Sequence, residues 1–299
     1  MDELNLDINA MSPEDVARLT PEQRLERLDA LIAEAHAIVA EVTRVYITGD
    51  NRELAAQCIL FSGGNDSTVL FDLFKGSSDY AIHCNTTIGI EQTRQFVRDV
   101  CEQAGVPLLE ILPPETYRDL VIANGFPGPA MHFKMYQRLK ERSLQTARKM
   151  LVSNGHRERV LFLAGRRRTE SSRRQSIPFT TRHGATVWAS PLLNWTKMDL
   201  SLYWEKYCTT PRNEVSDLIH MSGECLCGAF AHKGELEEIG MFFPEVVEEI
   251  RELETLVQLA GHPEKKCHWG WGADRTSADR GSKLGPLCSS CEQLPLFEA

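Results

Sequence analysis

The sequence predicts an α/β protein with an open, mostly parallel, twisted sheet and helices on both faces. Between residues 57 and 164, short apolar runs alternate with longer amphipathic segments, which is the pattern of successive βαβ units. A glycine-rich turn follows the first apolar run, and an arginine-rich turn follows the last one. Ligands bind such sheets beyond the carboxyl ends of the strands, so both turns are candidate binding loops.

The first fifty residues are predicted to form an N-terminal helical extension, 1–50. Ser12–Asp15 and Thr20–Gln23 each combine a capping hydroxyl, a proline at the first helical position and an acidic or amide residue in capping-box spacing. Apolar residues then recur at helical spacing from Leu25 to Ile38.

The region 51–212 is predicted to carry the sheet, and 213–299 to form a cysteine-rich C-terminal region. Strands are expected over residues 57–61, 80–84, 107–112 and 160–164. Helices are expected over residues 67–75, 91–104, 132–153, 195–207, 212–220 and 244–259. The sequence leaves the order of the strands open.

The composition favours a folded protein of the cytoplasm. The chain has 299 residues, of which 42% are hydrophobic, and a formal net charge of −9. It has no run of eighteen apolar residues, and Met1–Leu4 is acidic where a secretory signal would be basic. We therefore expect a cytoplasmic protein with no membrane partner, whose nine cysteines stay reduced. The oligomeric state is left open.

Positive charge is concentrated in one part of this acidic chain. Met131–Gly184 contains fourteen Arg and Lys residues against three Glu, a local charge of +11. The segment Lys134–Lys149 has two interpretations, a solvated helix face or a surface that contacts a polyanion, and the sequence leaves both open. The stretch GRRRTESSRR, residues 165–174, places five arginines in ten residues. Their mutual repulsion predicts that an anion binds there.

The glycine turn SGGNDST, residues 62–68, lies where a strand leads into a helix. A purely structural corner is one interpretation, and a Walker P-loop is excluded because G-x-x-x-x-G-K-[ST] is absent from the sequence. The stretch resembles the SGG-x-DS pyrophosphate loop of the adenine nucleotide α-hydrolase superfamily, the PP-loop ATP pyrophosphatases. Ser62, Ser67 and the helix N-terminus would then bind polyphosphate, while Asp66 orients the loop or holds Mg²⁺. Many members have lysine where this chain has Asn65.

Three further motifs follow in the order found in the phosphoadenosine phosphosulfate (PAPS) reductase-like branch of that superfamily. HCNTTIGIEQTRQFV resembles its Asn-Thr and Glu-Thr segment, and AGRRRTESSRR resembles its Gly-x-Arg-x-x-Glu-Ser-x-Arg-Arg signature. SPLLNWTKMDLSLYW resembles its Pro-x-x-x-Trp-x-x-x-Asp-Val segment, with Leu200 in place of valine. The resemblance makes 51–212 a Rossmann-like, nucleotide-binding PP-loop domain. It implies that the nucleotide contacts Ser62, Gly63, Gly64, Asn65, Asp66, Ser67, Asn85, Thr86, Gly165, Arg167, Glu170, Ser171, Arg173 and Arg174. Of these, Ser62, Asp66 and Arg167 are the expected catalytic residues.

Five cysteines of the C-terminal region have the spacing of metal ligands. They form a C-x-C pair, a single cysteine and a C-x-x-C pair, namely Cys225, Cys227, Cys267, Cys288 and Cys291. Small buried residues are the other interpretation, and thiolate ligation alone fits zinc or an iron–sulfur cluster equally well. The resemblance implies a [4Fe-4S] cluster, as in adenylyl-sulfate reductases and DNA-phosphorothioation enzymes, with zinc as the fallback. The other four cysteines are expected to be mostly packing residues. Among them, Cys84 lies at a strand end and is the candidate for another role.

The resemblance implies two enzymatic functions and one binding function. Sulfonucleotide reductases of this family, which produce sulfite, carry their nucleophile in a C-terminal Glu-Cys-Gly-(Ile/Leu)-His tail, whereas this sequence ends in CSSCEQLPLFEA. The resemblance therefore favours an ATP pyrophosphatase that adenylates a target so that a sulfur nucleophile can displace AMP. Its expected ligands and partners are ATP with Mg²⁺, a cysteine desulfurase, and DNA (phosphorothioation) or tRNA as the acceptor. Because many members have lysine at the position of Asn65, a third interpretation stays open, namely a nucleotide-binding interaction protein with reduced catalysis.

Overall fold

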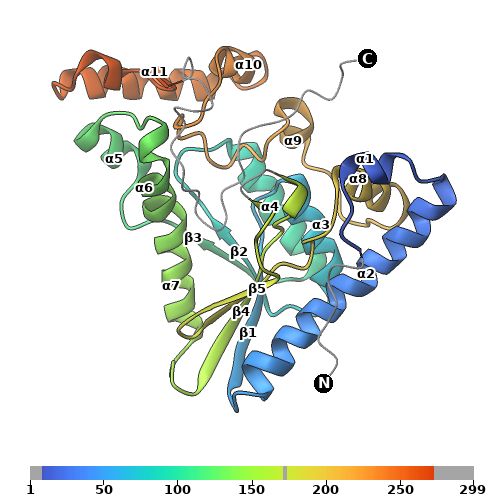
Figure 1. Ribbon diagram of the computed structural model, residues 1–299. Coiled ribbons are helices and arrows are strands. Elements are labelled where there is room, and N and C mark those ends of the chain that lie inside the picture. Colours follow the sequence, from blue (N-terminus) through green and yellow to red (C-terminus); the bar gives the residue numbers. More distant parts are fainter. Residues whose placement is uncertain (1–8, 171–173, 273–299) are drawn as a thin grey trace. The chain divides into compact units, whose positions relative to one another are not determined.

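The computed structural model describes residues 9–170 and 174–272 (Figure 1). Its centre is a six-stranded sheet of order β3-β2-β1-β4-β6-β5. The strands are β1 (Glu53–Leu60), β2 (Tyr80–Cys84), β3 (Leu108–Ile111), β4 (Glu158–Leu163), β5 (Thr180–His183) and β6 (Thr186–Ala189). β1 is parallel to β2 and to β4, β4 is parallel to β6, and β5 is antiparallel to β6. The predicted fold class is thereby confirmed.

The described chain divides into two compact units. Of the described residues, the first contains 9–83, 97–109, 147–170 and 174–212, and the second contains 84–96, 110–146 and 213–272. Two helices have residues in both units, namely α4 (Glu91–Ala104) and α7 (Arg142–Leu151). The expected helix over 132–153 is present as three successive segments, α6 (His132–Tyr136), a π-helical turn η3 (Gln137–Glu141) and α7.

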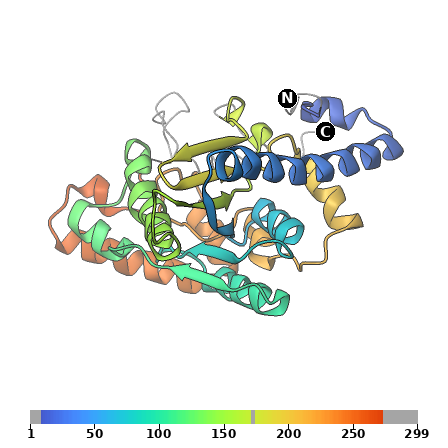
Figure 2. The ribbon, with the colours of Figure 1, turned by 90° about the horizontal axis from the view of Figure 1, so that it is seen from below.

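The N-terminal helices belong to the first unit. They are α1 (Pro13–Ala17) and α2 (Pro21–Thr43), and both begin at the predicted caps. At the start of α2, Thr20 and Gln23 form a complete capping box. α2 continues as the π-helical turn η1 (Arg44–Thr48). α2 packs against α8 (Lys197–Lys206) and β6, and Figure 2 shows it in blue beside the yellow-green strands. Leu28, Leu31 and Ile38 are fully buried on its inner side, so burial of this apolar stripe holds α2 to the first unit.

α3 (Asn65–Phe74) follows β1 and packs against β1 and α8 in the same unit. The Asp72 carboxylate joins these elements because it accepts hydrogen bonds from Tyr203 Oη at 2.7 Å, Lys75 Nζ at 2.6 Å and Thr210 Oγ1 at 2.7 Å. The hydrogen bonds from Lys75, Thr210 and Tyr203 outweigh the effect of burial and lower the pKa of Asp72 to about 2.

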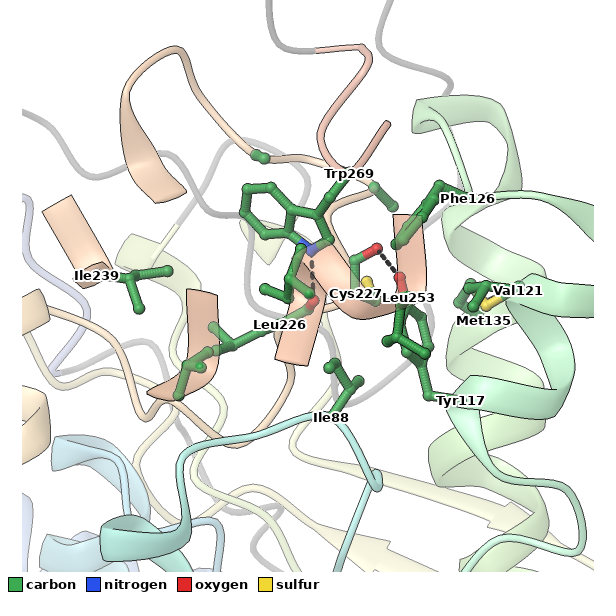
Figure 3. Close-up of a cluster of buried hydrophobic side chains, with 14 of the residues drawn as sticks. Ile88, Tyr117, Val121, Phe126, Met135, Leu226, Cys227, Ile239, Leu253 and Trp269 are labelled. Atoms are coloured by element: carbon green, nitrogen blue, oxygen red, sulfur yellow. Dashed lines mark hydrogen bonds between the residues drawn. The ribbon is translucent and has the colours of Figure 1, made fainter. Parts of the chain in front are cut away.

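The second unit is mostly helical and has its own apolar core (Figure 3). Its remaining elements are α5 (Tyr117–Asn124), η2 (Pro129–Met131), α9 (Glu214–Ile219), α10 (Glu235–Phe242), α11 (Pro244–Leu259) and η6 (Glu264–Cys267). The short helix η4 (Arg168–Glu170) belongs to the first unit. Tyr117, Phe126, Ile250 and Trp269 lie in this core. Within the described ranges, no helix is long and apolar enough to cross a membrane.

Candidate functional site

The glycine turn connects β1 to α3 and is held by its own serines. Ser67 Oγ donates to the carbonyl oxygen of Gly64 at 2.8 Å and lies 3.2 Å from Ser62 Oγ, while the Ser62 amide donates to Ser67 Oγ at 3.3 Å. Gly63 has φ 76°, a left-handed conformation that glycine adopts without strain. No side chain caps the N-terminus of α3, which begins at Asn65 after Gly64. Its first N–H groups can therefore donate to an anion.

The arginine turn follows β4, the strand that lies parallel and next to β1. Ile59 pairs with Leu163, so the glycine and arginine turns leave neighbouring strands at the same edge of the sheet. Gly165 allows their close approach, because a Cβ atom there would lie 3.2 Å from the carbonyl carbon and oxygen of Asp66. The structure therefore brings together Ser62–Ser67, Gly165 and Arg167, all of them predicted site residues.

A bidentate ion pair joins the two turns. Arg167 Nε lies 2.6 Å from Asp66 Oδ1, and Arg167 Nη2 lies 3.3 Å from Asp66 Oδ2. Burial would lower the pKa of Arg167, which is 4% exposed, but the Asp66 carboxylate raises it above its ordinary value. Because both carboxylate oxygens contact the guanidinium, this geometry favours the loop-orienting role of Asp66 over direct metal ligation.

The other described arginines of the turn also have partners within the first unit. Arg174 Nη1 donates to Glu170 Oε2 at 2.6 Å, and Arg166 Nε donates to Ser190 Oγ at 3.0 Å. Burial raises the pKa of Glu170, although Arg174 opposes that shift. Asp66 and Glu170 thus supply negative charge to this turn from the chain itself, and the binding of an anion there stays a prediction. Ser171 and Arg173 lie outside the described residues.

Asn85 and Thr86 belong to the second unit, where they are bonded to two glutamates. Asn85 Nδ2 donates to Glu110 Oε1 at 2.8 Å, and the Thr86 amide donates to Glu224 Oε1 at 2.7 Å. Thr86 Oγ1 also donates to the main-chain oxygen of Glu224. Glu224 is 1% exposed and lies 3.6 Å from the guanidinium of Arg94. Sequence reasoning missed Glu224, although its position next to Cys225 in GECLCG was a signal.

Cys225 and Cys227 form a thiol pair in the second unit. A hydrogen bond from the Cys227 side chain lowers the pKa of the Cys225 thiol to about 6, and the positive charge of Lys140 acts in the same direction against burial. The surrounding loop is fixed by main-chain acceptors: Tyr117 Oη donates to the oxygen of Cys227 at 2.9 Å, and Trp269 Nε1 donates to that of Leu226 at 2.7 Å (Figure 3).

The thiol pair has the donor chemistry of two adjacent metal ligands. Cys267 lies in the same apolar core, but its thiol donates weakly to the main-chain oxygens of His262 and Pro263, at 3.5 and 3.6 Å. Within residues 9–170 and 174–272, no three His, Cys, Asp or Glu side chains are grouped as a metal site. Cys288 and Cys291 lie outside the described residues. The cluster therefore stays a prediction that requires ligands beyond the Cys225–Cys227 pair.

The four remaining cysteines have the properties of protonated thiols. Burial raises the pKa of each of them to about 12, namely Cys58, Cys84, Cys101 and Cys208. Cys84 Sγ lies 3.9 Å from the main-chain oxygen of Lys140, which is a long contact for a thiol donor. Their environments are those of packing residues.

The model of the phosphoadenosine phosphosulfate reductase domain family matches residues 56–213, which include both turns and Asp199. The chain belongs to this family. A crystal structure of PAPS reductase from Candida auris in a phosphate complex is 20% identical, covers 70% of this chain and 94% of that chain, and has a TM-score of 0.43. Structures of Candida glabrata FMN adenylyltransferase, one with FAD and inorganic pyrophosphate and one with FMN and the ATP analogue AMPCPP, are 11% identical, cover 69% of this chain and 65% of that chain, and have TM-scores of 0.46. The comparison with curated proteins gave no match.

The last motif of the PAPS reductase domain family starts α8. Trp195 is fully buried, and Thr196 and Asp199 form a capping box in which Asp199 Oδ2 accepts from the Thr196 amide at 2.7 Å. Thr169 Oγ1 donates to the main-chain oxygen of Trp195 at 2.9 Å, so this motif contacts the arginine turn directly. Asp199 is thus a structural residue of the first unit.

Proposed function

We propose that this member of the PAPS reductase domain family is an ATP pyrophosphatase that adenylates a target for sulfur insertion. The observation that carries the proposal is the Asp66–Arg167 pair, because it joins a glycine turn and a guanidinium at one edge of the sheet. The uncapped N-terminus of α3 matches the oxygens of a polyphosphate, and Arg167, held beside the glycine turn by Asp66, adds positive charge.

In the proposed reaction, an oxygen of the target attacks the α-phosphorus of ATP, and the bond to the β-phosphate oxygen breaks. The amides of Ser62–Ser67 and the Arg167 guanidinium stabilise the negative charge that develops on the departing pyrophosphate. Mg²⁺ on the phosphates shares this role, and Asp66 keeps Arg167 in position. The products of this step are the adenylated target and pyrophosphate.

In the second step, a sulfur nucleophile attacks the activated atom of the target and AMP leaves. A [4Fe-4S] cluster held by four of Cys225, Cys227, Cys267, Cys288 and Cys291 would supply the sulfur chemistry, with zinc as the alternative metal. Cys225 and Cys227 fit adjacent positions in such a centre. A cysteine desulfurase is the proposed sulfur donor.

DNA is the proposed acceptor, in phosphorothioation, and tRNA is the second choice. Support comes from the basic segment Lys134–Lys149, in which Lys134 is exposed. Arg138 and Arg142 of this segment lie 3.8 and 3.4 Å from Glu115, so part of its charge is compensated within the protein. A cytoplasmic location is consistent with these substrates.

Product analysis after incubation with ATP and Mg²⁺ tests this proposal. With the acceptor present, release of pyrophosphate is the expected result, and addition of the sulfur donor should release AMP in an equal amount. Incubation with PAPS or adenylyl sulfate and thioredoxin tests the second candidate, a sulfonucleotide reductase, through the formation of sulfite. The lowered pKa of Cys225 favours that candidate, because a thiolate can attack the sulfur of a sulfonucleotide. A protein that binds nucleotide and turns over neither compound would be a nucleotide-binding interaction protein.

A further inference from the structure

A chain of buried polar contacts joins helix α2 to the arginine turn within the first unit. Its central residue is Asn194, whose Nδ2 donates to Glu34 Oε1 at 2.9 Å and whose Oδ1 accepts from Arg168 Nη1 at 3.4 Å. Asn194 is 2% exposed and Glu34 is 8% exposed. Glu34 Oε2 also accepts from Asn9 Nδ2 at 2.7 Å, so both carboxylate oxygens are bonded.

Arg27 ties the same helix to the family motif that starts α8. Its Nε and Nη2 contact the two carboxylate oxygens of Asp199 at 3.1 and 3.2 Å, and Nη2 also donates to the main-chain oxygen of Asn194 at 3.0 Å. The side chains of Arg27 and Asp199 are 6% and 2% exposed. A buried pair of this kind stabilises one arrangement, because shifting the helix would leave a charge unpaired in the interior.

Residues 190–196 transmit this arrangement to the arginine turn. The Arg168 amide donates to the oxygen of Leu193 at 2.9 Å, Thr169 Oγ1 donates to that of Trp195, and Arg167 Nη1 donates to Thr169 Oγ1 at 3.2 Å. Contacts from α2 and from the arginine turn therefore meet on the same short segment. Arg167, the residue that reaches Asp66, is at the end of this series of contacts.

We propose that Glu34 and Asn194 are positioning residues for the arginine turn, so that α2 is part of the anion-binding machinery. The Glu34 carboxylate acts on Arg168 through Asn194, which contacts both side chains, whereas Asp66 contacts Arg167 directly. Burial raises the pKa of Glu34, while Asn9, Asn194, Arg27 and Arg168 oppose this and support its ionised form. The consequence for catalysis rests on the proposed function, but the positioning of the turn does not.

Hydrogen exchange followed by mass spectrometry on the full chain tests the positioning. Glu34→Gln keeps the size of the side chain, removes its charge and replaces one of its two acceptor oxygens with a donor. We expect faster exchange in peptides covering residues 165–170, with unchanged exchange in β1. The matched control is Glu26→Gln, an exposed residue of the same helix, which should leave both regions unchanged. Arg168→Met removes the contact between the turn and Asn194 while the sequence of α2 stays the same, so it should reproduce the effect on residues 165–170.

Binding of inorganic pyrophosphate, measured by calorimetry, provides the second readout. We expect Glu34→Gln to weaken it about tenfold, whereas Glu26→Gln leaves it unchanged. Exchange of residues 165–170 at the wild-type rate in both Glu34→Gln and Arg168→Met would overturn the inference. An equal increase throughout β1 would also overturn it, because that result indicates a general loss of stability. A wild-type protein that binds no pyrophosphate would refute the proposed function, while the exchange result would still decide the positioning role.

Discussion

Arg167 Nε lies 2.6 Å from Asp66 Oδ1, although 101 positions separate the two residues in the sequence. Their contact depends on the parallel pairing of β1 with β4, which carries the two turns to the same edge of the sheet. The pair supplies negative charge from the chain itself to a segment with several arginines. It also gives the arginine turn a fixed position beside the glycine turn.

Replacing Asp66 by alanine should abolish the release of AMP and pyrophosphate from ATP. The buried Arg167 would lose its counter-charge, so we also expect unfolding to become easier by about 1–3 kcal/mol. Turnover and denaturant midpoints check these effects, and metal content should stay at the wild-type level because the thiol pair belongs to the other unit. Loss of metal together with activity would indicate damage to the whole fold.

Gly165→Ala should weaken pyrophosphate binding by separating the two turns. The new Cβ would lie 3.2 Å from the main chain of Asp66, and relieving such a contact costs about 1–3 kcal/mol. The control is Gly76→Ala, since a Cβ at Gly76 has no atom within 4 Å. Calorimetry should show weaker binding only for Gly165→Ala, and equal affinities for both variants would contradict the role of this close approach.

Asp72 should make the stability of the first unit depend on pH. Its pKa is lowered to about 2 in the folded protein against 3.8 ordinarily, so its contribution is present above about pH 4 and is lost as the pH falls towards 2. Asp72→Asn should therefore cost about 2 kcal/mol at pH 7 and much less near pH 2. Urea midpoints across this range provide the measurement. A cost that is the same at both ends would exclude the ionised carboxylate as the cause.

Trp269→Phe should expose the thiol pair to reagents. This substitution removes the hydrogen bond from Nε1 to the oxygen of Leu226, between the two cysteines, and leaves a buried carbonyl without that donor. Trp271→Phe is the matched control, because the lost bond there is to Phe126. Alkylation of metal-free protein by iodoacetamide, mapped by mass spectrometry, should be faster at Cys225 only for Trp269→Phe.

The proposed centre predicts that metal content depends on particular cysteines. Cys225→Ser and Cys227→Ser should each lower the iron or zinc bound per chain, while Cys101→Ser, at a buried packing position, should leave it unchanged. Elemental analysis and the visible absorption spectrum distinguish iron–sulfur from zinc. Equal metal content in all three variants would refute ligation by the C-x-C pair.

The sequence predicted those parts of the fold that depend on local pattern. The apolar runs of β1 and β4 and the caps of α2 were recognisable because each leaves a signal within a few residues. β5 and β6 were both missed, since Thr180–His183 and Thr186–Ala189 are segments of four residues whose strand conformation comes from pairing with their neighbours. Strand order was inaccessible for the same reason, because it is decided by pairing between distant segments.

The candidate site shows the same division. The glycine and arginine turns were found as motifs, but their ion pair was not predicted, because spacing alone does not say which acid faces which base. The burial of Arg27 and Glu34 was not predicted, because charged residues on a helix usually face solvent. Only their burial against Asn194 and Asp199 distinguishes them from the other charged residues of α2.

Trp271 packs over Gly128, where a Cβ would lie 2.3 Å from its ring, and Trp269 belongs to the same core. The second unit thus includes residues near position 270, whereas the residues of the first unit all precede position 213. During synthesis on the ribosome, the sheet and its two turns can fold before Trp269 and Trp271 of the helical unit have been synthesised. The thiol-bearing loop would then be the last part to acquire its shape, after the nucleotide loop is already formed.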